Sequence, residues 1–135
     1  MNEFLLPLLK WVGGKRQLIS KITARMPETF GTYYEPFFGG GALYFNQAPK
    51  KAVINDFNSQ LVNVYAQIKA NPNDVISFLT QYQNEYNQQI DKDARANCYY
   101  ENRDKFNNFI KNNIFTSKSA ALFIFLNKAG FNGLY

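Results

Sequence analysis

Three consecutive glycines, Gly39 to Gly41, follow an aromatic segment that contains Glu35 and precede an apolar segment that can begin a helix. Glycine lets the backbone turn sharply and approach a ligand, and the first turn of a helix offers N–H groups without intrahelical partners. A carboxylate beside them suits a ligand that carries hydroxyl groups or an ammonium. This segment therefore predicts a binding site built from a strand, a tight turn and a helix.

Two nucleotide-binding motifs match the glycine-containing segments only in part. The dinucleotide motif G-x-G-x-x-G fits the first and third of the three glycines, but the bulky Tyr44 stands where its last glycine belongs. The phosphate loop G-x-x-x-x-G-K-[ST] fits Gly14-Lys15, but Leu9 and Arg16 replace its first glycine and its hydroxyl residue. Neither an NAD site nor an ATP site is favoured.

Asp56 ends a second segment typical of a strand, residues 52–56. It could cap the helix that follows. A carboxylate after the second strand is also where Rossmann-like folds bind the two ribose hydroxyls, because an ionised acid can accept from both. We favour the ribose interpretation.

The elements that must position these residues follow from hydrophobic spacing. A helix is predicted over 15–26, where Pro27 ends it, then a strand over 32–36, a short helix over 41–46 and the strand over 52–56. A right-handed strand–helix–strand crossover makes the two strands parallel neighbours.

From residue 58 the spacing predicts four helices in succession. One precedes the Asn71-Pro72 break, a second runs to Ile90, a third contains Phe106, and Ser117 is expected to cap a fourth that runs to about Lys128. The tyrosines of this part are expected in its core, namely Tyr82, Tyr86, Tyr99 and Tyr100. We place a domain boundary near residue 57.

Composition narrows the class of protein. The chain has 135 residues with 15 basic and 10 acidic side chains, and its net charge of +5 modestly favours a polyanionic partner. It has one cysteine, Cys98, and no histidine, which excludes an internal disulfide and histidine-based metal or catalytic sites within these residues. No apolar run approaches the roughly 18 residues of a membrane span. We expect a cytoplasmic protein without a metal site, a secretion signal or a membrane contact.

Four segments in order resemble the Dam-type DNA adenine methyltransferases. They are residues 9–16 (LKWVGGKR), 35–41 (EPFFGGG), 54–56 (IND) and 131–135 (FNGLY). The resemblance implies methyl transfer from S-adenosylmethionine to the exocyclic amine of adenine in double-stranded DNA, with GATC as the family's common site. It implies an α/β fold: an incomplete Rossmann-like methyltransferase sheet in residues 1–56, followed by a helical DNA-recognition subdomain in residues 57–135 that stops within its final hairpin.

The resemblance also implies two sets of site residues. Lys15 is expected to meet the methionine carboxylate and Asp56 the ribose, within a cofactor set of Trp11, Lys15, Glu35, Phe37, Gly39, Gly41 and Asp56. The DNA contacts are expected at Lys10, Asn127, Lys128, Phe131 and Asn132. The Asn132-Gly133 dipeptide is also typical of a hairpin turn. Several of these residues have a simpler interpretation: Trp11 as a core anchor, Lys15 as a solvated residue in the first turn of a helix, Glu35 as a solvent-exposed strand end and Gly39 to Gly41 as a plain turn.

One hallmark of the resembled family does not occur in these 135 residues, the catalytic Asp-Pro-Pro-Tyr motif. We therefore expect the chain to be the N-terminal portion of such an enzyme and to be inactive alone. Its partners are then DNA and either the C-terminal half or a second copy of the fragment. The alternative is a non-catalytic DNA-binding module with a structural glycine loop, and only the first hypothesis requires cofactor binding.

Overall fold

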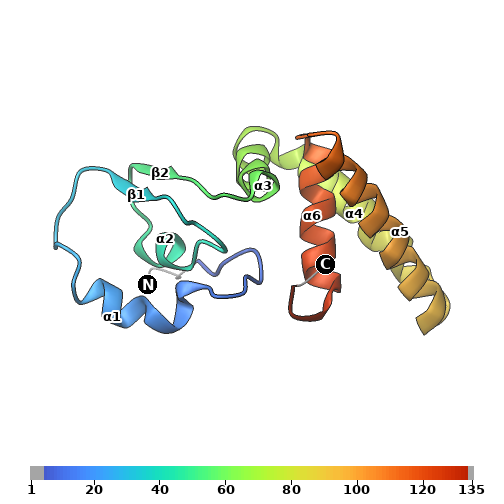
Figure 1. Cartoon of the computed structure of the whole chain (residues 1–135), viewed down its shortest axis with the longest axis horizontal. Helices are drawn as coiled ribbons and strands as arrows, with labels where there is room; N and C mark the ends of the chain where they lie inside the picture. Colours follow the sequence, from blue (N-terminus) through green and yellow to red (C-terminus); the bar gives the residue numbers. More distant parts are fainter. Residues whose placement is uncertain (1–4, 134–135) are drawn as a thin grey trace. The chain divides into compact units, whose positions relative to one another are not determined.

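The computed structural model describes residues 5–133 and divides the chain into two compact units, Met1–Phe57 and Asn58–Tyr135. The first unit is α/β and the second is helical (Figure 1). Among the described residues, no helix is both long enough and apolar enough to cross a membrane.

In the first unit a 3-10 turn, η1 (Lys15–Leu18), leads into α1 (Ile19–Thr23), and β1 (Tyr33–Glu35), α2 (Ala42–Gln47) and β2 (Ala52–Ile54) follow. The two strands pair in parallel, which confirms the predicted strand–helix–strand unit. The predicted helix over 15–26 is wrong in its extent. No side chain caps its start, because Gly14 stands at that position, and only five residues adopt α-helical geometry.

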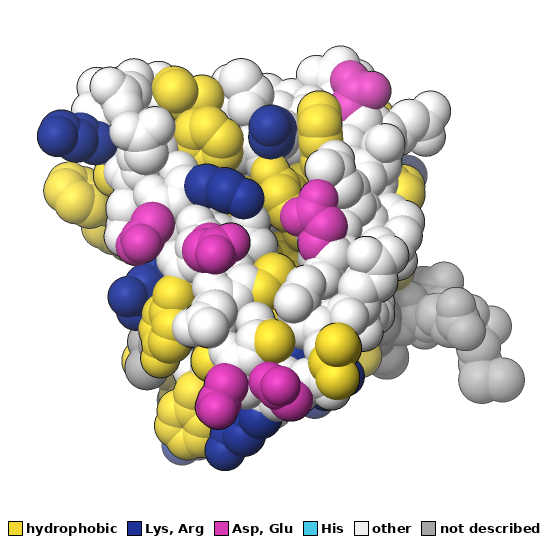
Figure 2. Space-filling model, turned by 90° about the vertical axis from the view of Figure 1, so that its right-hand side faces the viewer, with side chains coloured by type: hydrophobic (Ala, Val, Ile, Leu, Met, Phe, Trp, Pro, Cys, Tyr) yellow, Lys and Arg dark blue, Asp and Glu magenta, His cyan; other side chains and the backbone are white. Residues whose placement is uncertain are grey.

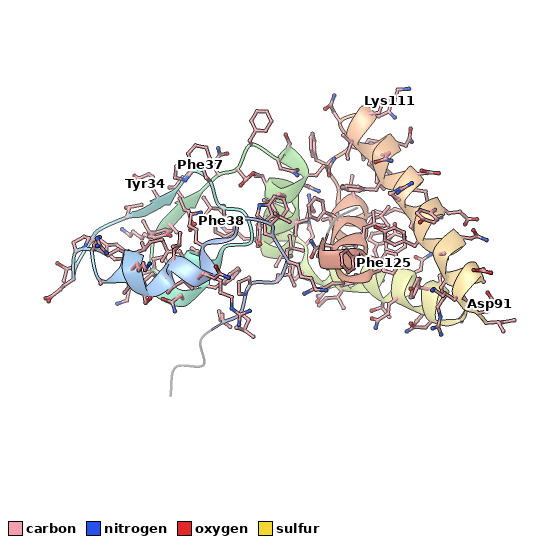
Figure 3. All side chains as sticks on the ribbon, turned by 60° about the horizontal axis from the view of Figure 1, so that its bottom comes forward. Tyr34, Phe37, Phe38, Asp91, Lys111 and Phe125 are labelled. Carbon is pink, nitrogen blue, oxygen red and sulfur yellow. The ribbon has the colours of Figure 1, made fainter. Side chains whose placement is uncertain are left out.

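The two faces of this small sheet differ. Tyr33 and Glu35 are buried on the face that α2 covers, where the rings of Tyr33 and Tyr44 lie 6.3 Å apart. On the other face the paired residues Tyr34 and Val53 are 69% and 51% exposed. Figure 3 shows Tyr34 on the outer side of the strand. Parallel sheets are normally covered on both faces, so this one has an uncovered apolar face among the residues described.

The second unit consists of α3 (Ser59–Ala70), α4 (Pro72–Asn87), α5 (Lys92–Lys111), α6 (Ser117–Ala129) and a short 3-10 turn, η2 (Phe131–Gly133). Helix α6 packs against α3, α4 and α5 (Figure 1). Every residue of α6 from 119 to 127 is buried. A helix that is apolar nearly all round must be central, and α6 therefore forms the core of the unit.

The starts of these helices are fixed by side chains and by proline. Asn58 accepts hydrogen bonds from the N–H groups of Gln60 and Leu61, Pro72 occupies the first turn of α4, and Asp91 caps α5. Helix α6 begins with a reciprocal capping box between Thr116 and Ser119. The predicted cap at Ser117 is therefore wrong by one residue.

One tyrosine expected in the core is exposed, and so is the last residue of the second helix predicted after residue 58. Tyr100 is 50% exposed, because its neighbour Tyr99 takes the inner position and successive residues of a helix point in different directions. The guanidinium of Arg103 lies 4.8 Å from the Tyr100 ring centroid. Ile90 is 96% exposed because α4 ends at Asn87, before that position. Tyr82 is buried and packs against Phe125.

We expect Phe123→Ala to lower the free energy of unfolding of the helical unit by about 3–5 kcal/mol, because it opens a cavity at a fully buried position. Phe115→Ala is the matched control, since Phe115 is 44% exposed and its loss is expected to cost much less. Urea unfolding followed by circular dichroism measures both. Equal losses would contradict the central position of α6.

Candidate functional site

The glycine turn after β1 can be built only with glycine at two positions. Gly39 and Gly41 have φ angles of +55° and +74°. A Cβ on Gly41 would lie 2.5 Å from Phe38 Cζ, and a Cβ on Gly39 would lie 2.8 Å from Trp11 Cδ1. The turn is therefore close-packed as well as left-handed, and side chains at either position are excluded.

Trp11 packs directly on this turn. Its indole approaches Gly39, and its Cβ lies 3.1 Å from where a Cβ of Gly40 would be. The side chain is partly exposed, so one part of the indole anchors the loop while another remains accessible. The core-anchor and ligand-contact interpretations of Trp11 are thus compatible.

Glu35 is buried and surrounded by donors. Its side chain is 5% exposed, Lys15 Nζ lies 3.0 Å from Oε1, and the Tyr33 hydroxyl donates to Oε2 at 2.6 Å. Lys15 Nζ also donates to the carbonyl of Phe37. The interpretation of Glu35 as an exposed strand end is wrong, because its side chain is buried. Lys15 pairs with Glu35 although 33% of the lysine side chain remains exposed.

The contact between Lys15 and Glu35 is an ion pair rather than an aligned hydrogen bond. Oε1 is buried and has no hydrogen-bond partner among the described residues, although the ammonium lies 3.0 Å away. The contact shown for Oε1 is therefore the electrostatic one with the Lys15 ammonium. A buried acceptor without a hydrogen bond calls for a physical explanation, and a ligand that donates to it is one.

Asp56 closes the site from the second strand. Its Oδ2 accepts from the backbone N–H of Gly39 at 2.8 Å, and Phe38 N donates to the Asn55 carbonyl at 2.9 Å. The alternative that Asp56 caps the next helix is wrong, since Asn58 does so. These bonds join the turn after β1 to the residues after β2.

The structure therefore connects most of the predicted cofactor residues within the first unit. Phe37 is different, because its side chain is 75% exposed and only its carbonyl takes part, whereas Phe38 is buried (Figure 3). The residue that sequence reasoning missed is Tyr33. Its position two residues before Glu35 on one face of a strand was the available signal.

The predicted DNA-contacting residues lie in different environments. Lys128 and Phe131 are exposed, Phe131 by 83%, and Lys10 is exposed in the first unit. Asn127 is fully buried, and its Nδ2 donates to the Gly133 carbonyl at 3.2 Å. The side chain of Asn132 and the residues Leu134 and Tyr135 lie outside what the structure describes.

The segment in which a hairpin turn is predicted is described only as far as Gly133. Phe131–Gly133 form the 3-10 turn η2 directly after α6. The Asn127 side chain and the Gly130 carbonyl both bond to Gly133, which closes a single helical turn.

The net positive charge is not gathered on the face drawn in Figure 2, where lysine and arginine side chains alternate with acidic ones. A groove of about 460 Å³ in the helical unit shows the same mixture. Lys92 and Arg95 line it together with Asp91 and Ala129. This groove therefore offers little net attraction for a polyanion.

The first unit thus defines a class of protein. Its glycine turn and two carboxylates lie at the carboxyl ends of parallel strands, which is where α/β folds bind their ligands. The sequence model of the D12 class N6 adenine-specific DNA methyltransferases matches residues 11–135. The chain belongs to this family, which confirms the resemblance drawn from its motifs.

The names of individual relatives agree with this family assignment. Type II methyltransferase M1.LlaDCHI of Lactococcus lactis subsp. cremoris is 44% identical over 131 residues, 97% of this chain and 43% of that protein. Type II methyltransferase M.MjaIII of Methanocaldococcus jannaschii is 38% identical over 138 residues, 96% of this chain and 47% of that protein. DNA adenine methylase of Escherichia coli (strain K12) is 30% identical over 126 residues, 93% of this chain and 41% of that protein. The chain spans less than half the length of each of these relatives.

We expect Gly41→Ala to destabilise the first unit by about 1–2 kcal/mol from the left-handed backbone alone, with a further cost from contact with Phe38. Gly31→Ala is the control, because a Cβ there meets nothing within 4 Å and its φ is not left-handed. Thermal unfolding followed by the fluorescence of Trp11, the only tryptophan, measures both. A Gly41→Ala chain as stable as the control chain would refute the close packing of the turn.

Proposed function

We propose that this chain supplies the S-adenosylmethionine-binding part and a DNA-recognition part of an enzyme that methylates the exocyclic amine of adenine in double-stranded DNA. Membership of the family and the names of the relatives support the reaction class. The observation that carries the proposal is the buried Oε1 of Glu35, which lacks a hydrogen-bond partner among the described residues and lies beside Lys15 and the glycine turn.

The residues present fit the cofactor. S-adenosylmethionine supplies an activated methyl group and carries an ammonium, a carboxylate and two ribose hydroxyls. Glu35 offers an acceptor to the ammonium, and Lys15 offers a charge-assisted donor to the carboxylate. Asp56, already held by Gly39, is assigned to the ribose hydroxyls. Trp11 and Phe37 supply apolar surface, and Gly39 and Gly41 allow close approach to the backbone.

The DNA contacts are assigned to the exposed end of α6 and to Lys10. Methylating adenine inside a duplex requires rotating the nucleotide out of the stack, at a cost of a few kcal/mol. The 83% exposed Phe131 can wedge between bases, while Lys128 and Lys10 hold phosphates. Asn127 positions η2 from within the core of the helical unit. Asn132 is assigned to the DNA contacts by family resemblance alone. We propose GATC as the target on the same basis.

The uncovered face of the sheet is proposed as a contact for further polypeptide. Tyr34 and Val53 expose apolar surface on a parallel sheet, which normally has both faces buried. The relatives are more than twice as long as the matched region, so polypeptide carrying the Asp-Pro-Pro-Tyr motif is the proposed partner. A second copy of this chain is the competing occupant, and light scattering distinguishes them.

Calorimetric titration of S-adenosylmethionine into the chain tests the proposal. We expect binding that Asp56→Ala abolishes or weakens more than tenfold, because the substitution removes the ribose acceptor and its bond to Gly39. Asp74→Ala is the control, since Asp74 lies in the helical unit. DNA binding without any cofactor binding would instead support a non-catalytic DNA-binding module.

The purified 135-residue chain is expected to transfer no methyl groups to DNA, because it contains no Asp-Pro-Pro-Tyr to orient the target amine. Transfer of a radiolabelled methyl group to duplex DNA containing GATC measures this. Adding polypeptide that carries the motif in trans is expected to restore activity. Activity of the chain by itself would refute this expectation.

A further inference from the structure

A buried tyrosine holds the carboxylate at the centre of the proposed cofactor site. The Tyr33 hydroxyl donates to Glu35 Oε2 at 2.6 Å, the short distance typical of a hydrogen bond to an ionised carboxylate. Both side chains are at least 93% buried, with exposed fractions of 7% and 5%. The two residues are separated by one position on β1 and share its buried face.

The Tyr33 ring is itself fixed from several directions. It packs against Phe30 and against Tyr44 of α2, with centroids 6.3 Å away in each case. Its backbone N–H donates to the Lys51 carbonyl at 2.9 Å. Three separate segments therefore contact the residue, and these contacts restrict the orientation of its ring.

This arrangement separates the two oxygens of Glu35. Oε2 receives the tyrosine hydrogen bond, whereas Oε1 faces Lys15 and has no hydrogen-bond partner among residues 5–133. Burial, together with the neighbouring Glu35, raises the pKa of Tyr33 well above its ordinary value. The phenol therefore stays protonated and acts as a donor. Without it, Glu35 could rotate and satisfy Oε1 elsewhere.

We propose that Tyr33 is a positioning residue for S-adenosylmethionine, acting through Glu35 by occupying Oε2 so that Oε1 is directed at the ammonium of the ligand. This inference rests on the proposed function of the site. It assigns to Tyr33 a role that differs from that of the adjacent tyrosine, since Tyr34 lies on the opposite face of β1 and is 69% exposed.

The first test is calorimetric titration of S-adenosylmethionine into the full chain carrying Tyr33→Phe. This substitution removes the hydroxyl and keeps the ring that packs on Phe30 and Tyr44. We expect about tenfold weaker binding, the scale of one hydrogen bond to a charged group. Tyr34→Phe is the matched control and is expected to bind like the unsubstituted chain. Unchanged affinity in Tyr33→Phe overturns the inference.

A double-mutant cycle separates positioning from a general structural effect. In a Glu35→Gln background, Tyr33→Phe is expected to cause no further loss of affinity, because the hydroxyl acts only through the carboxylate. An equal loss in both backgrounds overturns the inference and indicates that the hydroxyl supports the fold. Absence of any binding by the unsubstituted chain overturns the proposed function, and the inference with it, and is distinguishable from both other results.

Discussion

The hydrogen bond from Gly39 N to Asp56 Oδ2 joins the turn that follows β1 to the segment that follows β2. It requires the left-handed glycine at position 39, and that position is in turn covered by Trp11. An N-terminal segment, the first strand and the second strand therefore meet at one point. The carboxyl ends of the two strands form a single site because this bond and the parallel pairing hold them in register.

The same site contains a buried carboxylate, that of Glu35. Glu35 is stabilised by Lys15 on one oxygen and by Tyr33 on the other, which offsets the cost of removing a carboxylate from water. Lys15 remains partly exposed, with 33% of its side chain accessible, so the ion pair borders solvent. A ligand with charges of both signs can exchange one set of pairings for another without leaving either side chain buried and unpaired.

The helical unit is specified by polar contacts as well as by its apolar core. Asn63 of α3 donates to Thr116 O and Ser119 Oγ, both at 3.1 Å, and Gln60 donates to the Ile114 carbonyl at 3.0 Å. An apolar surface permits several sliding positions, whereas these bonds are satisfied in one register only. This network fixes the position at which α6 starts. It thereby also fixes the direction of the helix toward Lys128 at its other end.

The sequence alone determined the strand–glycine–helix–strand order, the parallel pairing, the succession of helices and the family, because periodicity, glycine and proline are local signals and the family motifs are short. It did not determine the short extent of α1, the exposure of Tyr100 or the helical turn at Phe131. Only the tertiary structure decided that Glu35 is buried between Lys15 and Tyr33 and that Asn127 lies in the core. Those outcomes depend on desolvation and on side chains brought together by packing, and a one-dimensional pattern contains neither.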